Sequence, residues 1–414
     1  MNVLQINRNY SNGGAAVVAK RLHNNLNNLS GYKSTLLCRN SGSSTNEGVI
    51  ELYPNMFGRI KSILIDKFEQ VTGYQYFYQK NLNSIIDLSA FKQADVIHFH
   101  ITHGGYIDQK FIIEVAKLKP VVWTFHDMWA LTGRCAHSYD CDKWENGCGM
   151  CLYTHTYPRQ YIDRSAYLWK LKKDLYSSVN IHVVSPSKWL CEKISKSIVK
   201  HWSVSIVPNS VDLLMFDYRK DQQDKIRGEL CLPLNRKIFL FVAHGGVNNE
   251  FKGFGILNKA LHEVSNDGIQ PYLLVIGGNE KTDLKEFDLS GESIGVVNDE
   301  SLLSAYYTAS DFYIMPSNQE NLPLTIIESL ACGTPVVAFN VGGIPEMINH
   351  QVTGYLAEKE SIRSLIDGIT WAYNLSSKEY LKSSESCRMS ARKNYSIDDF
   401  VKKHIAIYKN IIKG

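Results

Sequence analysis

The chain has 414 residues, of which 44% are hydrophobic and 21% are charged, so it is long enough for two or three domains and has the composition of a soluble globular protein. It has no apolar run near the roughly 18 residues that a membrane span needs, no signal-peptide layout and no dense basic run with aromatic residues, so we expect a cytoplasmic protein without a nucleic-acid partner. The net charge of +4 is uneven, because residues 1–212 carry 24 basic and 16 acidic residues and residues 213–414 carry 21 and 25.

The first half alternates short apolar strands with helical segments. The expected strands are residues 3–6, 34–38, 94–99, 120–125, 181–184 and 204–207, and the expected helices are residues 15–29, 107–118 and 186–199. Strands separated by helices imply βαβ crossovers and a parallel sheet.

The second half repeats this alternation after a charged, polar stretch, residues 217–236, which we interpret as a linker and the start of a domain. The expected strands are residues 238–242, 272–276, 294–297 and 311–315, and the expected helices are residues 254–264, 301–309, 322–332 and 397–412. We therefore predict an α/β protein with two doubly wound parallel sheets, which face each other across a cleft at the carboxyl ends of their strands.

A glycine pair and a histidine follow strands of the first half. Gly13 and Gly14 open the first helix, where a ligand can approach the backbone and an anion is favoured, although a plain loop is the alternative. His126 ends the strand at residues 120–125 and precedes Asp127, a position that carries function in open α/β sheets, unless the ring is only structural.

Residues 56–71 have an apolar stripe at helical spacing. Basic residues lie between the apolar ones, and a tyrosine-rich segment, residues 74–78, follows; the stripe consists of Phe57, Ile60, Leu64, Phe68 and Val71. This pattern is typical of an interfacial helix, and with the +8 balance of the first half it indicates peripheral contact with an anionic membrane. A helix that packs its stripe into the core would have the same pattern.

Four cysteines lie within 17 residues, and they are Cys135, Cys141, Cys148 and Cys151. In a cytoplasmic chain such a group favours a metal over disulfides, and four thiolates would make a closed structural zinc site. Only one pair has the usual C-x2-C spacing, so free cysteines packed in a loop are the alternative.

The second half places a lysine and two glutamates near strand ends. Lys252 follows the strand at residues 238–242, where its charge can lie on a diphosphate. Glu320 stands at the start of the helix predicted at residues 322–332, and Glu328 lies two turns inside it. The amides of Asn321 and Leu322 would bind an anion there, while carboxylates accept hydrogen bonds from hydroxyls, a combination that suits a sugar nucleotide.

Read together, these motifs resemble the family-four retaining glycosyltransferases, which have the GT-B fold of two Rossmann-like domains. The resemblance is carried by Gly13-Gly14, Thr124-Phe-His-Asp127, Val207-Pro-Asn-Ser-Val-Asp212, Lys252-Gly253, the Glu320–Glu328 loop, Gly342-Gly-Ile-Pro-Glu346 and Thr353-Gly-Tyr-Leu356. It is closest to bacterial transferases for colanic acid and O-antigen, which carry a segment similar to residues 129–135 followed by further cysteines.

The resemblance implies an acceptor-side domain at residues 1–212, a donor domain at residues 213–397, and a C-terminal helix at residues 398–414 that crosses back to the first domain. It implies transfer of a hexose-type sugar from a nucleotide-diphosphate sugar to a growing, lipid-linked surface glycan, such as an O-antigen, capsule or exopolysaccharide. Transfer would retain the anomeric configuration and use no catalytic cofactor. For a cytoplasmic protein, we expect any peripheral membrane contact on the inner face of the cell membrane.

The resemblance also implies roles for single residues. Glu320 and His126 would act on the donor sugar, Glu328 would bind the ribose, Lys252 and the Asn321–Leu322 amides would bind the diphosphate, the Gly13-Gly14 loop would contact the donor, and Gly295 would hold the base. The family pairs the lysine with an arginine five residues earlier, where this chain has Val247. A sugar-nucleotide epimerase on the same fold and a non-catalytic sugar-nucleotide-binding subunit are the alternative functions.

Overall fold

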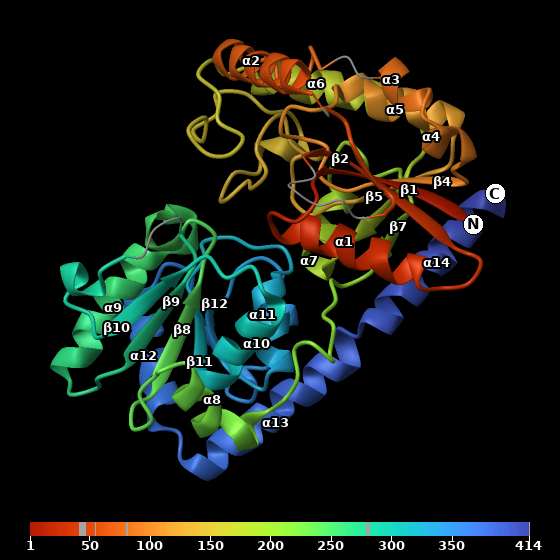
Figure 1. The fold of residues 1–414 in the computed structure, drawn as a ribbon. Helices are drawn as coiled ribbons and strands as arrows, with labels where there is room; N and C mark the ends of the chain where they lie inside the picture. Colours follow the sequence, from red (N-terminus) through yellow and green to blue (C-terminus); the bar gives the residue numbers. More distant parts are fainter. Residues whose placement is uncertain (41–46, 54, 80–81, 279–281, 414) are drawn as a thin grey trace. The chain divides into compact units, whose positions relative to one another are not determined.

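The computed structural model describes residues 1–40, 47–53, 55–79, 82–278 and 282–413 (Figure 1). Contacts divide the chain into two compact units. Unit 1 consists of Met1–Val207 and Phe400–Gly414, and unit 2 consists of Pro208–Asp399.

Unit 1 is built on a seven-stranded sheet in the order β3-β2-β1-β4-β5-β6-β7, and every described pairing is parallel. The strands are β1 Asn2–Asn9, β2 Lys33–Asn40, β3 Val49–Glu51, β4 Val96–Phe99, β5 Val121–Thr124, β6 His182–Ser185 and β7 Val204–Ile206. β4 and β5 are buried along their whole length, which explains their continuous apolar sequences. The edge strand β3 was not predicted, because three residues are too few for a periodic pattern.

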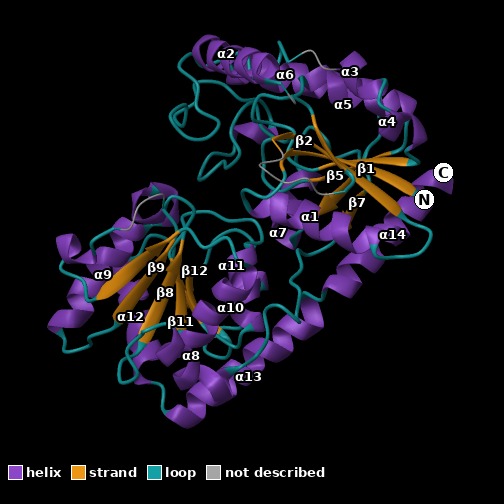
Figure 2. Cartoon of the chain, viewed as in Figure 1, coloured by secondary structure: helices purple, strands orange, loops and turns teal. Residues whose placement is uncertain are grey.

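Helices cover both faces of this sheet (Figure 2). They are α1 Gly14–Asn27, α2 Met56–Thr72, α3 Leu82–Ile86, α4 Ser89–Gln93, α5 Gln109–Leu118, α6 Ser165–Tyr176, α7 Lys188–Ser195 and α14 Ile397–Lys413. The main core cluster of unit 1 includes aromatic residues from β4, α5 and β5, namely Phe99, Phe111 and Trp123.

Buried polar contacts attach α14 to the sheet of unit 1. His98 on β4 lies 2.6 Å from the Tyr408 hydroxyl through Nδ1 and 2.8 Å from Thr124 Oγ1 through Nε2. The ring of His404 lies 5.5 Å from that of His98. Burial lowers the pKa of His98 well below its usual value and that of His404 to about 4, so both rings are neutral near pH 7. His98 is therefore a structural histidine.

Unit 2 contains a six-stranded parallel sheet in the order β10-β9-β8-β11-β12-β13. Its strands are β8 Ile238–Val242, β9 Tyr272–Ile276, β10 Gly291–Gly295, β11 Phe312–Met315, β12 Val336–Phe339 and β13 Gly354–Ala357. Its helices are α8 Gln223–Glu229, α9 Phe254–Asn266, α10 Glu300–Ala309, α11 Leu324–Ala331, α12 Ile362–Asn374 and α13 Ser377–Asn394. The two predicted doubly wound parallel sheets are thus confirmed, although β10 begins three residues before the predicted strand.

The contacts separate the units after Val207, five residues before the predicted boundary. Two interactions explain the difference. The Asn209 side chain donates to Leu322 O at 2.7 Å, and Val211 N donates to Tyr395 O at 3.0 Å. Residues 208–212 therefore pack with unit 2.

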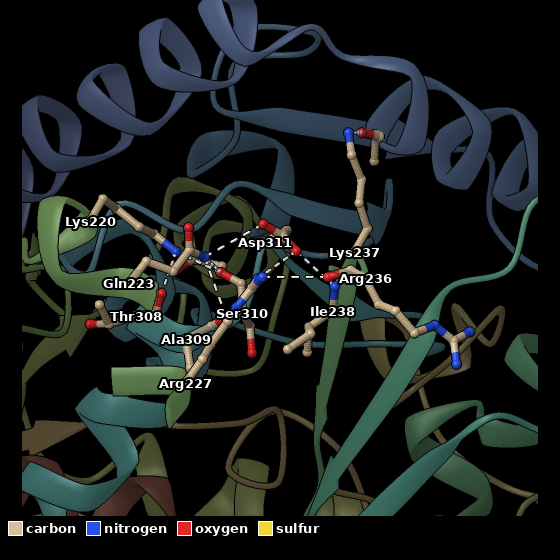
Figure 3. A network of polar contacts seen from close by, with 12 residues as sticks. Lys220, Gln223, Arg227, Arg236, Lys237, Ile238, Thr308, Ala309, Ser310 and Asp311 are labelled. Atoms are coloured by element: carbon tan, nitrogen blue, oxygen red, sulfur yellow. Dashed lines mark hydrogen bonds and ion pairs between the residues drawn. The ribbon is translucent and has the colours of Figure 1, made fainter. Parts of the chain in front are cut away.

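The interpretation of residues 217–236 as a linker and the start of a domain is wrong only in its linker part. The stretch lies near the start of unit 2 and holds the 3-10 helix Lys220–Gln222 and α8, which pack on the end of α10 (Figure 3). Lys220 Nζ donates to Thr308 O at 2.8 Å and Ser310 O at 2.5 Å, and Arg227 Nε donates to Ala309 O at 2.7 Å. Cations are favourable at a helix C-terminus, where carbonyls lack partners. Lys220 and Arg227 thus complete α10 instead of facing solvent.

Replacing Lys220 with methionine should destabilise unit 2. The change keeps side-chain volume but removes the donor to Thr308 O, and a buried carbonyl without a partner costs about 2 kcal/mol. We expect a loss of about that size in urea unfolding. The control is Lys225→Met on α8, whose side chain is 74% exposed and should change stability by less than about 0.5 kcal/mol. Equal stability of the two variants would contradict a structural role for Lys220.

Candidate functional site

The strand order of unit 2 reverses between β8 and β11, so the loops that follow these strands meet at the carboxyl edge of the sheet. The first loop carries Lys252 and the second carries Glu320. Lys252 Nζ lies 2.7 Å from Glu320 Oε1, and the two side chains are only 20% and 12% exposed. The structure thus brings together two predicted site residues from separate loops.

Two glycines allow the backbones around this ion pair to approach closely. Gly253 has φ +75°, and a Cβ atom there would lie 1.9 Å from Pro316 O. Gly342, in the loop after β12, has φ +57°, and a Cβ atom there would lie 1.7 Å from Glu320 O. Any side chain at either position would push the loops apart.

Backbone hydrogen bonds join the same loops. Asn318 N donates to Phe251 O at 3.2 Å, and Gly343 N donates to Glu320 O at 3.2 Å. The loop after β11 is therefore bonded to one neighbouring loop at Asn318 and to the other at Glu320, and it places the Glu320 carboxylate near the switch point.

Asn321 and Leu322 lie in the loop before α11, because that helix begins at Leu324, two residues later than predicted. Pro323 is the N-cap and has an extended backbone, and a proline disfavours the helical conformation of the residue before it. The amides of Asn321 and Leu322 are consequently loop amides beside Glu320.

Glu328 and Gly295 occupy two further positions in unit 2. Glu328, on α11, is 6% exposed, and its Oε2 accepts a hydrogen bond of 3.5 Å from the Tyr307 hydroxyl. Gly295 ends β10 with φ +83°, and its carbonyl accepts from Gly277 N at the end of β9 at 2.7 Å. Gly277 and Gly295 thus lie at the carboxyl edge of the sheet.

In unit 1 the predicted residues also lie at the carboxyl edge, where the strand order reverses between β1 and β4. Gly13 is the N-cap of α1 with φ +94°, a Cβ atom there would meet nothing within 4 Å, and Gly14 begins the helix. His126 lies two residues after the end of β5. The backbone at Gly13 is therefore accessible to a ligand.

Asp127 makes contacts that sequence reasoning missed. Its Oδ2 lies 2.8 Å from His103 Nε2, and its Oδ1 accepts from Trp129 N at 2.8 Å. Burial opposes ionisation, but the charge and hydrogen bond of His103 and the Trp129 amide outweigh it and hold the pKa of Asp127 below its usual value. His103 and Asp127 each follow one of two adjacent strands, β4 and β5. This position in the sequence was the signal from which their contact could have been predicted.

A chain of buried polar groups fixes the protonation of His126. His100 Nδ1 lies 3.1 Å from His126 Nε2. The Gln5 side-chain amide is oriented so that its nitrogen donates to His100 Nε2 at 2.9 Å and its oxygen accepts from the Ser34 hydroxyl, because only this orientation gives both atoms a suitable partner. His100 then donates through Nδ1, so the proton of neutral His126 sits on Nδ1. Burial lowers the pKa of His126 to about 4, although Asp127 opposes this shift, so the ring is neutral near pH 7.

The four clustered cysteines line one cavity of about 340 Å³ in unit 1. All nine cysteines of the chain are free thiols. In the described part of the chain no three His, Cys, Asp or Glu side chains converge as metal ligands would. Burial raises the pKa of Cys148 to about 12, and its sulfur accepts from Gly133 N at 3.2 Å. A structural zinc on these thiols stays a prediction.

The segment next to these cysteines is organised by one buried arginine. Arg134 is 1% exposed, and its guanidinium donates to the carbonyls of Tyr153, Thr154, Thr156 and Pro158. Lys172 donates to Trp129 O at 2.6 Å and Thr132 O at 3.0 Å from the other side. These hydrogen bonds give the loop a defined path.

Two family models match the chain. The model described as Glycosyltransferase Family 4 matches residues 12–213, and the model described as Glycosyl transferases group 1 matches residues 222–394. A protein of Escherichia coli strain K12, assigned as a colanic acid biosynthesis glycosyl transferase, is 24% identical over 388 residues, which cover 88% of this chain and 89% of the relative.

Solved structures share the fold over the whole chain. Sucrose-phosphate synthase from Thermosynechococcus elongatus has a TM-score of 0.71 at 17% identity and covers 100% of this chain and 99% of its own. The Anabaena protein HepE, in complex with UDP-glucose, has a TM-score of 0.66 at 13% identity and covers 99% and 100%. The architecture is therefore GT-B.

The two glycine contacts can be tested by adding one methyl group. Gly342→Ala should lower the free energy of unfolding by about 2 kcal/mol or more, because the new Cβ atom meets Glu320 O and the positive φ is strained. Gly255→Ala on α9 is the matched control, since a Cβ atom there meets nothing and alanine favours a helix, so it should gain up to about 1 kcal/mol. Chemical denaturation measures both, and an unchanged Gly342→Ala protein would contradict the described contact.

The cysteine cavity can be tested by metal analysis. We predict about one zinc per chain after purification under reducing conditions, lost when Cys148 and Cys151 are both replaced by serine and kept in Cys191→Ser, which lies on α7. A strong chelator should lower the thermal stability of the native protein. Absence of zinc, with all four thiols open to titration, would refute the metal site.

Proposed function

The chain belongs to the family-four glycosyltransferases, and on that premise we propose that it transfers a hexose-type sugar from a nucleoside-diphosphate sugar to a growing surface glycan with retention of anomeric configuration. The matched family models cover both units, and the relative from Escherichia coli is assigned to colanic acid, which supports a surface polysaccharide as the product.

The observation that carries the proposal is the Lys252–Glu320 pair at the switch point of unit 2. A lysine ammonium suits the negative charge of a diphosphate, and a carboxylate suits the hydroxyls of a sugar. Lys252 Nζ and Glu320 Oε1 are 2.7 Å apart, so one ligand that carries a diphosphate and a sugar can bind the lysine through its phosphate and the glutamate through its hydroxyls. HepE, whose fold is similar, is described in complex with UDP-glucose, which supports a donor of this class.

The chemistry assigned to this site is substitution at the anomeric carbon. The bond from that carbon to the phosphate oxygen breaks, the acceptor oxygen forms the new bond on the same face, and the acceptor proton passes to the departing phosphate. The protein then needs to orient the groups and stabilise the charge that develops on the diphosphate. Lys252 would supply that charge stabilisation, and Glu320 would hold the sugar.

The other predicted residues take supporting roles in this proposal. Glu328 is a buried carboxylate suited to the paired hydroxyls of a ribose, and the carboxyl edge near Gly295 offers backbone groups to a base. His126 is neutral near pH 7 and carries its proton on Nδ1. It would therefore donate a hydrogen bond to the donor sugar, and it would not act as a charged imidazolium acid. Gly13 and Gly14 are both exposed, so their backbone is accessible to the ligand.

We further propose that the acceptor is a glycan carried on a lipid. The support is the assignment of the Escherichia coli relative to colanic acid biosynthesis and the exposed apolar side chains of α2 in unit 1. An epimerase on the same fold would instead release a free sugar, and a binding subunit would leave the donor intact, so analysis of the products separates the three functions.

Substitution of the ion pair tests the proposal. Glu320→Ala should reduce turnover at least about a hundredfold, the scale of one lost transition-state contact, and weaken donor binding less. Lys252→Ala should chiefly weaken binding of the donor and of the free nucleoside diphosphate. The donor is first identified by thermal shift with UDP- and GDP-sugars, because a bound ligand raises apparent stability.

The controls are Lys259→Ala and Glu263→Ala, which remove the same charges from exposed positions of α9. Both should keep native kinetics and native donor affinity. Normal turnover in Glu320→Ala would refute the assignment of the site. A native protein that no sugar nucleotide stabilises would refute the proposed donor class.

A further inference from the structure

Helix α2 packs on unit 1 with its polar face. Ser62 and Glu69 are each 1% exposed, and they are the buried residues of this helix. Ser62 Oγ donates to Gly105 O at 3.1 Å, and Glu69 Oε1 accepts from the amides of Phe77 and Tyr78 at 2.7 Å each. The helix is thus held by hydrogen bonds and not by its apolar stripe.

The apolar side of α2 faces solvent, so the alternative of a core-packing stripe is wrong. Phe57 is 79% exposed, Leu64 is 62% exposed and Phe68 is 53% exposed. The set of exposed apolar residues, called the α2 face below, consists of Met56, Phe57, Ile60, Ile63, Leu64, Phe68 and Val71. Soluble proteins rarely leave a continuous apolar patch of this kind without a partner.

Neighbouring segments extend the α2 face. Tyr161 and Ile162 are exposed, and Tyr161 N donates to Gln70 O on α2 at 3.0 Å. Tyr78 is exposed and its ring lies 5.6 Å from that of Phe68. Tyr76, by contrast, is buried, so the tyrosine segment contributes less to this surface than its sequence suggested.

The basic residues of α2 lie on its solvent side, and its acidic residues lie on the side that packs against unit 1. Arg59, Lys61 and Lys67 are exposed, whereas Asp66 is partly buried and Glu69 is buried. Burial raises the pKa of Glu69 to about 7, although the amides that it accepts from oppose this shift. The solvent side of the helix is therefore apolar and cationic.

A basic cavity adjoins this surface. It has a volume of about 200 Å³ and is lined by Arg8, Asn9, Arg39, Glu51, Tyr53, Arg59 and Ile63. Three arginines face one carboxylate there, and Arg59 pairs with Glu51 at 2.7 Å. Ile63 belongs to the α2 face, so the cavity offers positive charge at the edge of the apolar surface.

We propose that the α2 face docks unit 1 on the surface of a membrane that contains anionic lipid. An apolar stripe flanked by cations is suited to lie at the boundary between headgroups and acyl chains. A second copy of the chain fits less well, because a two-fold contact through this face would bring like charges together. No described helix is long and apolar enough to cross a membrane, so the contact is peripheral.

Flotation with lipid vesicles tests the proposal on the full chain. The native protein should float with vesicles that contain about a third anionic lipid, and raising the salt concentration should weaken binding, because exposed charges are screened. Phe57→Asp with Phe68→Asp should reduce binding at least about tenfold, since each change removes apolar surface and adds a repelled charge. Both side chains are more than half exposed, so the fold should survive.

The matched control is Leu381→Asp with Met389→Asp, which makes the same change at exposed apolar positions of α13 in unit 2 and should leave flotation unchanged. Lys61→Glu with Lys67→Glu is a second test that leaves the apolar face intact and should also reduce binding. Sedimentation of the native protein without lipid distinguishes self-association, and a dimer that the Phe57→Asp, Phe68→Asp change disperses would overturn the proposal. Failure of native flotation at low salt would overturn it too, whatever the outcome of the donor-binding experiments.

Discussion

The candidate site depends on the close approach of three loops, which is possible only because Gly253 and Gly342 lack side chains. Parallel strands fix where each loop begins, but they do not bring the loops into contact. The contacts of Gly253 with Pro316 O and of Gly342 with Glu320 O do so. With the backbone of Glu320 held in this position, its carboxylate lies within hydrogen-bond distance of Lys252, which is 68 positions away in the sequence. A backbone constraint thus defines the position of the chemical groups.

The sequence predicted ten of the thirteen described strands, because most buried parallel strands are continuous apolar runs. The strands β3, β12 and β13 received no prediction, although β12 is such a run. The sequence also placed Lys252 and Glu320 in the loops that follow two such strands, and the structure brings their side chains together. Glu328 was predicted inside the next helix, and it lies on α11. It could not predict the ion pair, because periodicity carries no information on contacts between loops. The start of α11 was missed for a local reason, since Pro323 imposes an extended backbone on Leu322.

Other elements were missed because their burial does not follow hydrophobicity. Lys220 and Arg227 are 7% and 4% exposed, although lysine and arginine are usually on the surface. Helix carbonyls and Asp311 take up their hydrogen bonds, so the polar stretch is an integral part of unit 2. Helix α13 received no prediction because its apolar pattern is weak. Its N-terminal capping box, Ser376 with Glu379, was the available signal.

Helix α2 marks the limit of pattern analysis, because a core helix and an interfacial helix share one periodicity. What distinguishes them is whether the polar side can be satisfied inside the protein. Here Glu69 Oε1 accepts from two backbone amides and the Ser62 hydroxyl donates to a carbonyl, so the fold provides partners for these two groups of the polar side. The apolar stripe contributes little to the core of unit 1. Substitutions in the apolar stripe of α2 should therefore change the binding properties of this surface far more than the stability of the fold.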